Sequence, residues 1–297
     1  MKKRYFVAAL PLLAYCLSAG CGKEKDTASF SVMTYNIAGL PEPVSGSKPA
    51  TNTTVIGRLC NTIDIVHVQE DFHYHDSFLL HDRHPYQTPF MGEAFYGDGL
   101  NTFSAFPIHD FSRTQWTDCA DFDCFTPKGF SYSRIEVAPG MPVDFYNVHT
   151  NAKSYEAALV ARQKNTRQLC EYIKSHSAGR PVIVMGDMNS RYTRVGDSIR
   201  NVLDLGFKDV WIELVRGGNI PLQDGQPLEN CGENGDGRTR YDCEKVDKIF
   251  YRSGTDIEIY PVTYILDSRR YYYRQNDTLP LSDHWPAFAV FKARRRN

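Results

Sequence analysis

The segment 181–191 reads PVIVMGDMNSR and carries two polar side chains, Asp187 and Asn189, immediately after a run of apolar residues. The run from Val182 to Met185 is short, apolar and rich in β-branched residues, which is typical of a buried β-strand. A carboxylate is costly in a hydrophobic core unless it has a partner there. We therefore expect the end of this strand to face a ligand.

The same pattern recurs along the chain. Strands are predicted at 31–37, 63–70, 130–137, 143–150, 181–189, 245–252 and 283–291, and helices at about 155–176 and 197–205. The polar residues at strand ends are Asn36, Glu70, His149, Asp187, Asn189, Asp283 and His284. One such residue alone usually belongs to a turn. Several in one chain indicate that packed sheets deliver them to one common edge.

A divalent metal site is expected at this edge. A cluster of acids without matching cations would repel itself unless a metal ion lay among them. The oxygens of Glu, Asp and Asn suit Mg²⁺, with Mn²⁺ or Ca²⁺ as alternatives, better than they suit a metal that prefers thiolates. Asp187 and Asn189 are expected to form the floor of this site.

The first twenty residues are typical of an export signal. Three cations at 2–4 precede a short apolar run, and small residues then lead to Cys21. The ending SAGC resembles a bacterial lipoprotein box, which implies cleavage before Cys21 and lipidation of its sulfur. We expect a signal at 1–20, a tether at 21–29 and a single catalytic domain at 30–297. The protein would then be a lipoprotein of the bacterial cell envelope, with plain secretion as the alternative.

The composition does not indicate a strongly basic protein. The chain has 297 residues, of which 42% are hydrophobic and 23% charged, as in ordinary globular proteins. Loss of the three signal cations, and of no acid, changes the formal charge from −1 to −4. A dedicated nucleic-acid binder would need a basic surface instead.

Cysteine usage favours disulfides. Cys16 lies in the signal and Cys21 is the expected lipid acceptor, so an even set of cysteines remains in an exported chain. The sequence cannot choose among their pairings, but two pairs would close short polar loops. The favoured pairs are Cys119–Cys124 and Cys231–Cys243, which leaves Cys60–Cys170.

Zinc is the competing explanation for the cysteines and for one group of histidines. No C-x-x-C spacing is present, so a cysteine zinc site is not favoured. The segment 73–85, HYHDSFLLHDRHP, contains several histidines without a fixed ligand spacing. We expect these histidines to be structural or solvent-facing.

Seven segments together resemble the endonuclease/exonuclease/phosphatase superfamily across about residues 30–291. The segments are MTYNIAGLPE, HVQED, GLNTFSAFPI, NVHTNA, MGDMNSR, VDKIFY and LSDHWPAF. The resemblance implies an α/β fold, a four-layer sandwich of two packed mixed β-sheets flanked by helices. It also implies a Mg²⁺-dependent hydrolase that cleaves phosphate esters with an activated water.

The resemblance assigns roles to the strand-end residues. Glu70 corresponds to the principal metal ligand, Asn36 helps to place metal and phosphate, and Asp283 corresponds to a second carboxylate on the metal side. The implied catalytic residues are His284 as general base, Asp247 behind its imidazole, His149 on the phosphate or leaving group, and Asp187 with Asn189 on the water and phosphoryl oxygens.

Finer features favour the neutral and bacterial sphingomyelinase branch, which cleaves phospholipid head groups. The segments TPKGFSYSRI and VHTNA, with Arg162 in the following helix, resemble that branch. The run SRRYYYRQ suits a bilayer interface. The expected contacts with substrate or membrane are Tyr271, Tyr272, Tyr273 and Arg191.

Other functions stay open at this point. A DNase-like endonuclease, with nucleic acid as substrate, is the main alternative. An inositol-phosphate phosphatase and a non-catalytic surface-binding protein are further alternatives, although the intact acids and histidines argue against the last. We expect a monomer that meets a phosphate ester at a membrane surface and is held there by its lipid anchor.

Overall fold

The structure is a computed structural model and describes residues 27–42, 44–45, 47–228, 243–266 and 280–296. The expected export signal, residues 21–26 of the tether, and the residues Cys21, Cys231, Tyr271, Tyr272 and Tyr273 lie outside these ranges. Within them, no helix combines the length and the apolar character that a membrane crossing would require.

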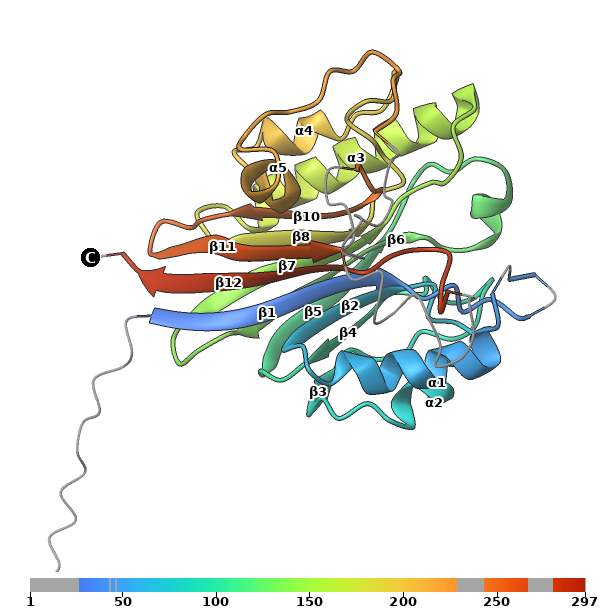
Figure 1. Cartoon of the computed structure of the whole chain (residues 1–297), viewed down its shortest axis with the longest axis horizontal. Helices are drawn as coiled ribbons and strands as arrows, with labels where there is room; N and C mark the ends of the chain where they lie inside the picture. The colour runs from blue at the N-terminus through green and yellow to red at the C-terminus, as the bar shows by residue number, and fades with distance from the viewer. Residues whose placement is uncertain (1–26, 43, 46, 229–242, 267–279, 297) are drawn as a thin grey trace, which may run out of the picture.

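Two six-stranded sheets form the centre of the molecule (Figure 1). The first sheet has the order β11-β12-β1-β2-β4-β3, with the bounds Ile257–Leu266, Ala287–Arg295, Thr27–Asn36, Ile65–Gln69, Asn101–Ser104 and Tyr86–Gln87. The second has the order β5-β6-β7-β8-β10-β9, with the bounds Ile108–Gln115, Gly129–Glu136, Pro142–His149, Val182–Asp187, Asp247–Arg252 and Lys208–Asp209. Both are mixed, because β1–β2 and β7–β8 are parallel among antiparallel neighbours.

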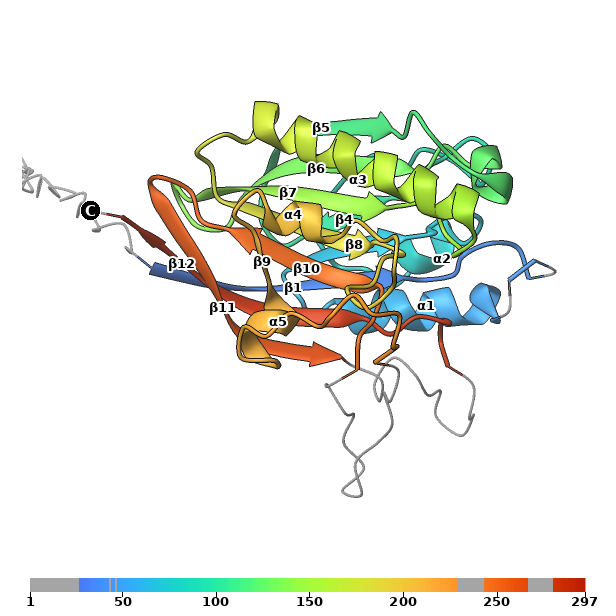
Figure 2. The same cartoon turned by 90° about the horizontal axis from the view of Figure 1, so that it is seen from above.

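Helices cover the outer face of each sheet (Figures 1 and 2). The first sheet carries α1 (Pro49–Cys60) and α2 (His75–Leu79). The second carries α3 (Glu156–His176), α4 (Arg200–Leu203) and α5 (Val210–Leu214). One hydrophobic cluster lies between the sheets, and one lies under each helical layer. The four-layer sandwich expected from the sequence is confirmed.

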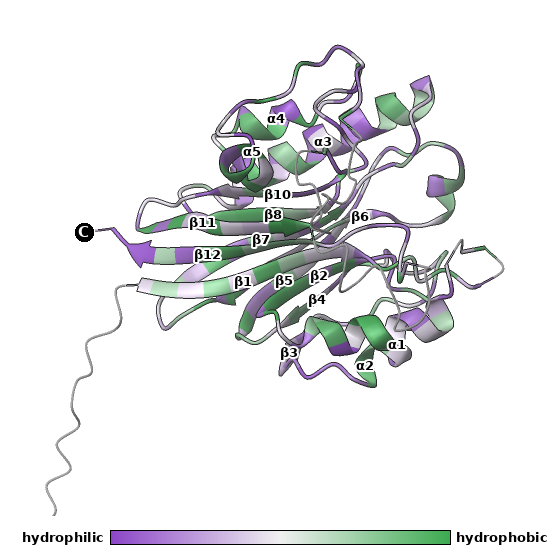
Figure 3. Cartoon of the chain, in the orientation of Figure 1, coloured by the Kyte–Doolittle hydropathy of each residue, from purple (hydrophilic) through white to green (hydrophobic). Residues whose placement is uncertain are grey.

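Strand β8 lies within the segment 181–191 and shows why that segment is so apolar. Ile183 and Met185 pack into the cluster between the sheets, whereas Val182 and Val184 pack beneath the helices. A strand buried on both faces reads as a continuous apolar run instead of an alternation. Figure 3 shows the same hydrophobic character along the central strands.

The parallel pairs place the functional residues. In the first sheet Asn36 is opposite Gln69, and in the second His149 is opposite Asp187. Both pairs lie at the carboxyl ends of their strands, so the two sheets present these ends at one edge, away from the chain's C-terminus (Figure 1).

The ends of most predicted elements differ from the structure by a few residues, and two cases illustrate this. The last strand was expected from residue 283 but begins at Ala287, so Asp283 and His284 lie in the preceding turn. The helix expected at 197–205 is limited to α4. In both cases the local pattern predicted the element, and tertiary contacts set its ends.

The disulfide predictions have mixed outcomes. Cys119–Cys124 is confirmed, and Cys243 is disulfide-bonded while its expected partner lies outside the described residues. Cys60–Cys170 is wrong, because both cysteines are buried and neither forms a disulfide. Cys60 is the last residue of α1 and Cys170 belongs to α3, so the two lie in opposite outer layers. A buried cysteine can pack as a small hydrophobic residue without forming a disulfide. The even number of cysteines therefore did not show that the last two are paired.

Candidate active site

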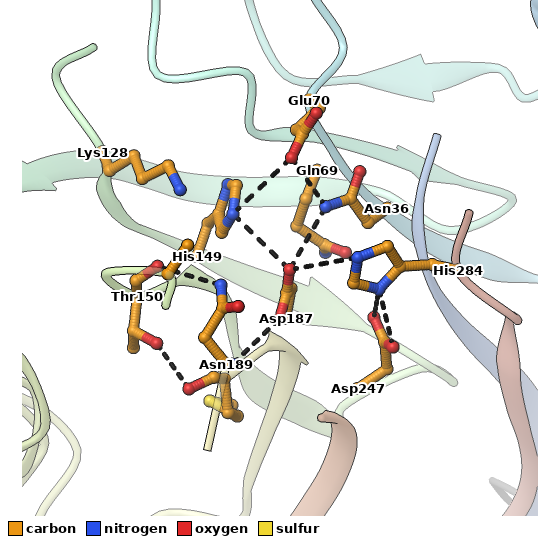
Figure 4. Close-up of polar contacts among 12 residues, drawn as sticks. Asn36, Gln69, Glu70, Lys128, His149, Thr150, Asp187, Asn189, Asp247 and His284 are labelled. Carbon is orange, nitrogen blue, oxygen red and sulfur yellow. Dashed lines mark hydrogen bonds and ion pairs between the residues drawn. The ribbon is translucent and has the colours of Figure 1, made fainter. Parts of the chain in front are cut away.

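Asn36 connects the acids of the two sheets (Figure 4). Its Nδ2 donates to Glu70 Oε1 at 2.9 Å and to Asp187 Oδ2 at 3.2 Å. Its Oδ1 accepts from the Ala38 backbone at 3.1 Å, which fixes the orientation of the amide. Glu70 and Asp187, predicted as metal-side and catalytic residues, therefore lie together.

Beneath this group, a buried amide pair holds the sheets in register. Gln69 Nε2 donates to Asn147 Oδ1 at 2.7 Å, and Asn147 Nδ2 donates to the Val68 carbonyl at 3.0 Å. Every partner is buried, so these hydrogen bonds are not exchanged with water. The floor of the site is consequently rigid.

Two of the site residues adopt left-handed backbone conformations. Glu70 has φ 57° and Asn189 has φ 45°. Such values are uncommon for non-glycine residues and cost free energy unless the surroundings hold them. The Asn189 N–H donates to Asp187 Oδ1 at 2.9 Å, and its Nδ2 donates to the Thr150 carbonyl at 3.2 Å. These bonds aim the Asn189 side chain across the end of β7.

His284 and Asp247 form a pair. His284 Nδ1 is 2.9 Å from Asp247 Oδ2, and its Nε2 is 3.7 Å from Asp187 Oδ2. Burial opposes protonation, but the carboxylates of Asp247 and Asp187 outweigh it and raise the pKa of His284 well above its usual value. In the neutral form of His284, the carboxylate of Asp247 holds the proton on Nδ1 and leaves Nε2 able to accept one.

Asp187 lies at the centre of the acids. Burial raises its pKa to about 6, with the charge of His284 opposing the rise and that of Asp247 adding to it. Ligand atoms of Asp187, Asp247 and His284 lie within 4.8 Å of one another, a spacing that a metal ion could bridge. In the described part of the chain, the ion-pair partners of Glu70 and Asp187 are histidines. Hard oxygen donors without a paired lysine or arginine fit a divalent cation.

His149 completes the predicted set. Its Nε2 is 3.5 Å from Asp187 Oδ2 and 3.9 Å from Glu70 Oε1. Burial lowers the pKa of His149 well below its usual value, and the charges of Lys128 and His284 lower it further. This imidazole is therefore neutral and available to donate one hydrogen bond.

Lys128 is a site residue that the sequence analysis did not single out. Its amine points toward His149 in Figure 4, and Nζ pairs with Asp123 Oδ1 at 2.8 Å. Its charge contributes to the lowered pKa of His149 and opposes the rise in the pKa of Asp187. The sequence analysis uses the segment TPKGF only for its family resemblance. The local signal that could have identified Lys128 is a cation directly before strand β6.

Two other predicted residues are not hydrogen-bonded to this group among the described contacts. Asp283 is exposed, and its Oδ1 accepts from Ser282 at 3.4 Å. Its charge contributes to the raised pKa of His284, but among the described residues it has no hydrogen bond or ion pair with Glu70 or Asp187. The Arg191 N–H donates to Asp197 at 2.8 Å, which ties its backbone to the loop after β8. Their proposed roles stay predictions.

The histidines of 73–85 do not converge. His73 pairs with Glu93 at 3.2 Å, and His75 pairs with Asp71 at 2.7 Å. His84 pairs with Asp82 at 2.6 Å. Among the described residues, none of these histidines belongs to a group with metal-binding spacing. The structural interpretation given to these three therefore agrees with their contacts.

Comparison with known proteins places this geometry in a family. Residues 61–290 match the model of endonuclease/exonuclease/phosphatase family 2. The sphingomyelinase of Mycobacterium tuberculosis is 35% identical over 272 residues, which cover 88% of this chain and 52% of that protein. A putative neutral sphingomyelinase of Drosophila melanogaster is 28% identical over 176 residues, which cover 54% of this chain and 39% of that protein. The chain belongs to endonuclease/exonuclease/phosphatase family 2, and it spans about half the length of the mycobacterial protein.

Solved structures share the fold. A Staphylococcus aureus beta toxin mutant with bound magnesium ions has a TM-score of 0.61 at 20% identity, over 88% of this chain and 99% of that one. TDP2 of D. rerio in complex with a single-strand DNA product has a TM-score of 0.62 at 15% identity, over 89% of this chain and 98% of that one. At these identities the likeness concerns the fold alone.

Proposed function

We propose that this protein is a divalent-metal-dependent phosphodiesterase that hydrolyses the head group of a phospholipid, in the manner of a sphingomyelinase. The observation that carries the proposal is the convergence of Glu70, Asn36 and Asp187 with the His284–Asp247 pair at one edge of both sheets. The choice of a lipid substrate rests on the 35% identity to mycobacterial sphingomyelinases.

Glu70, with Asn36 and Asp187 beside it, would hold the cation, for which we favour Mg²⁺. When bound, a divalent ion polarises a phosphoryl oxygen and offsets the charge of the acids. The hard oxygen donors and their lack of a lysine or arginine ion pair in the described chain support this assignment.

The chain's own residues supply the proton chemistry. His284 accepts the proton of the attacking water at Nε2, and Asp247 holds Nδ1–H and stabilises the imidazolium that forms. Asp187 and Asn189 orient the water and the phosphoryl oxygens. His149 donates to the phosphate or the leaving oxygen, and the charge of Lys128 stabilises the developing negative charge.

Exposed aromatic rings beside the site support a membrane-bound substrate. Phe122 is 78% exposed and Phe125 is 60% exposed, both in the 3₁₀ helix η1 (Asp121–Phe125). Between them, Asp123 pairs with Lys128, so the short helix that carries both rings is tied to a residue of the site. Exposed apolar rings next to a site commonly mark contact with a lipid or a partner surface.

Export and lipidation remain part of the proposal. The sequence supports a signal at 1–20 and a lipid on Cys21, which would hold the enzyme at the bacterial cell envelope as a monomer. Palmitate labelling of the full chain and of Cys21→Ser tests this directly. Label retained by Cys21→Ser would contradict the lipoprotein assignment.

Three substrates distinguish the proposed function from its alternatives. Sphingomyelin vesicles, plasmid DNA and a soluble inositol phosphate are each incubated with Mg²⁺ and with EDTA. We expect phosphocholine release from the vesicles that EDTA abolishes. Faster cleavage of plasmid DNA would favour a nuclease, release of inorganic phosphate from the inositol phosphate would favour a phosphatase, and no turnover would favour a non-catalytic protein. Turnover insensitive to EDTA would contradict the metal assignment.

A further inference from the structure

Arg162 is a fully buried arginine in α3 with no direct role in the proposed chemistry. Its Nε and Nη2 donate to Asp197 Oδ1 at 2.9 and 2.7 Å. Its Nη1 donates to the carbonyls of Asn151 and Lys153 at 2.8 and 2.7 Å. A buried charge is tolerated only when it is paired and hydrogen-bonded to this degree.

These partners belong to two different loops that both leave the site. Asn151 and Lys153 follow His149 at the end of β7, and Asp197 belongs to the loop that follows Asp187 and β8. Arg162 therefore connects the segments after the two strands that carry the predicted catalytic residues of the second sheet.

The second oxygen of Asp197 extends the connection to Asn189. Asp197 Oδ2 accepts from the Arg191 N–H at 2.8 Å and pairs with Arg194 Nη1 at 3.1 Å. Arg194 Nη1 also donates to the Asn189 carbonyl at 2.9 Å. The carboxylate thus restrains the backbone of Asn189 through one intermediate side chain.

Both loops contain residues in left-handed backbone conformations. Lys153 has φ 67° and Asn189 has φ 45°. The loops also bond each other directly, because the Thr150 hydroxyl donates to the Met188 carbonyl and Asn189 Nδ2 donates to the Thr150 carbonyl. Strained conformations persist only where several contacts fix them, and the network centred on Arg162 provides these contacts.

We propose that the Arg162–Asp197 pair is a positioning pair that fixes the His149 loop relative to the Asn189 loop. This inference rests on the proposed function for its catalytic consequence. It predicts a selective defect, because Glu70 and Asn36 come from the first sheet and Asp187 belongs to β8 itself. None of the contacts of Arg162 or Asp197 in the described chain reach these three residues. Loss of the pair should therefore lower turnover while leaving binding of the cation intact.

A second arginine–aspartate pair provides a matched control. Arg134 Nε donates to Asp144 Oδ1 at 2.9 Å, and Asp144 is buried. This pair lies at the start of β7, at the opposite end of the strand from His149. Its loss should cost stability without moving the site.

The experiment compares Arg162→Lys and Asp197→Asn with Arg134→Lys. For each, kcat and KM on vesicles and on bis(4-nitrophenyl) phosphate, Mg²⁺ affinity by calorimetry, and amide hydrogen exchange are measured well below the melting temperature. We expect both site variants to lower kcat by about 10- to 100-fold, since displacement of about 1 Å has this effect. KM and Mg²⁺ affinity should change by less than about threefold, and exchange should quicken in 150–153 and 188–191 together. Arg134→Lys should keep its kcat within about twofold.

A partly exposed variant guards against failure to fold. Arg194 is 26% exposed, and Arg194→Gln removes only the link from Asp197 to Asn189, with an expected loss in kcat of about 5- to 10-fold. Unchanged kcat in Arg194→Gln and the folded site variants, a parallel loss in Arg134→Lys, or faster exchange in only one loop would overturn the proposal. A wild-type chain that hydrolyses no phosphodiester would contradict the proposed function instead, while the exchange data would still report whether the loops are coupled.

Discussion

The amide of Asn36 lies 3.2 Å from the carboxylate of Asp187, although the two residues are 151 positions apart and belong to different sheets. This contact joins the metal-side residues of the first sheet to the catalytic residues of the second. A site of this kind depends on the packing of both sheets, so its chemistry and the stability of the fold are connected.

Glu70→Gln tests the metal assignment. Loss of one negative charge from the acidic group should weaken Mg²⁺ binding by more than about 10-fold and reduce hydrolysis accordingly. Calorimetry with Mg²⁺ gives the affinity, and thermal unfolding shows whether the variant is folded. Glu93→Gln, which alters an exposed acid, is the control. Equal Mg²⁺ affinity in Glu70→Gln and the wild type would rule out Glu70 as a ligand.

His284→Ala tests the general base. Turnover should fall by about 10²- to 10⁴-fold with folding intact. Because His284 and Asp247 act as a unit, adding Asp247→Asn should lower turnover little further. Steady-state kinetics of the two single variants and the double variant give the comparison, with the exposed His109→Ala as the control. Additive losses, or retained turnover in His284→Ala, would remove the proposed role.

His67 predicts how stability depends on pH. Burial lowers the pKa of His67 to about 3, with a backbone hydrogen bond to Met185 opposing the shift. As the pH falls below about 6.5, the unfolded chain binds a proton at His67, whereas the folded chain binds it only near pH 3. The contribution of His67 to the free energy of unfolding is therefore complete above pH 6.5 and is lost as the pH falls toward 3. Between pH 8 and pH 5 this one group should cost about 2 kcal/mol.

Urea unfolding at pH 8 and pH 5 measures this effect. His67→Leu should be less stable than the wild type at pH 8, because the hydrogen bond between His67 and Met185 is lost, but its stability should fall less between the two pH values. His73→Ala, at an exposed position, should keep the wild-type pH dependence. If the free energy of unfolding of His67→Leu fell between pH 8 and pH 5 as much as that of the wild type, His67 would not be the source of this pH dependence.

Phe122→Ala/Phe125→Ala tests the lipid surface. Removal of two exposed rings should reduce binding to phosphocholine vesicles by about 10-fold or more, since each ring would bury apolar area in the interface. Sedimentation in the His284→Ala background measures binding without turnover. Leu222→Ala removes a side chain that is 76% exposed and serves as the control. Hydrolysis of a soluble phosphodiester should not change, and equal vesicle binding by all variants would exclude this surface.

The sequence predicted those parts of the fold and site that have a local signal. The apolar run of β8 and its terminal Asp187 are adjacent in the chain, so the local sequence pattern predicted both the strand and the polar residue at its end. Helix α1 was not predicted, because it buries Asn52, Thr53 and Gly57 where an amphipathic helix would carry large apolar residues. Strand β11 was not predicted, since Pro261 interrupts its pattern at a register shift.

Long-range pairings were beyond local pattern. Lys128 gains its importance from His149, to which it is brought by the pairing of β6 with β7. Cys60 and Cys170 looked like a pair by count, yet two sheets separate them. Both cases depend on which strands become neighbours, which composition and periodicity do not specify.

The positive φ values of Glu70 and Asn189 have a consequence for natural and laboratory selection. Glycine adopts this backbone region without a steric cost, so replacing either residue by glycine would remove strain while deleting a functional group. A screen for heat resistance alone would therefore favour the loss of these two side chains. Their persistence would need continuing selection for the function of these side chains. A descendant copy of the gene that is free of this selection should drift toward glycine at both positions.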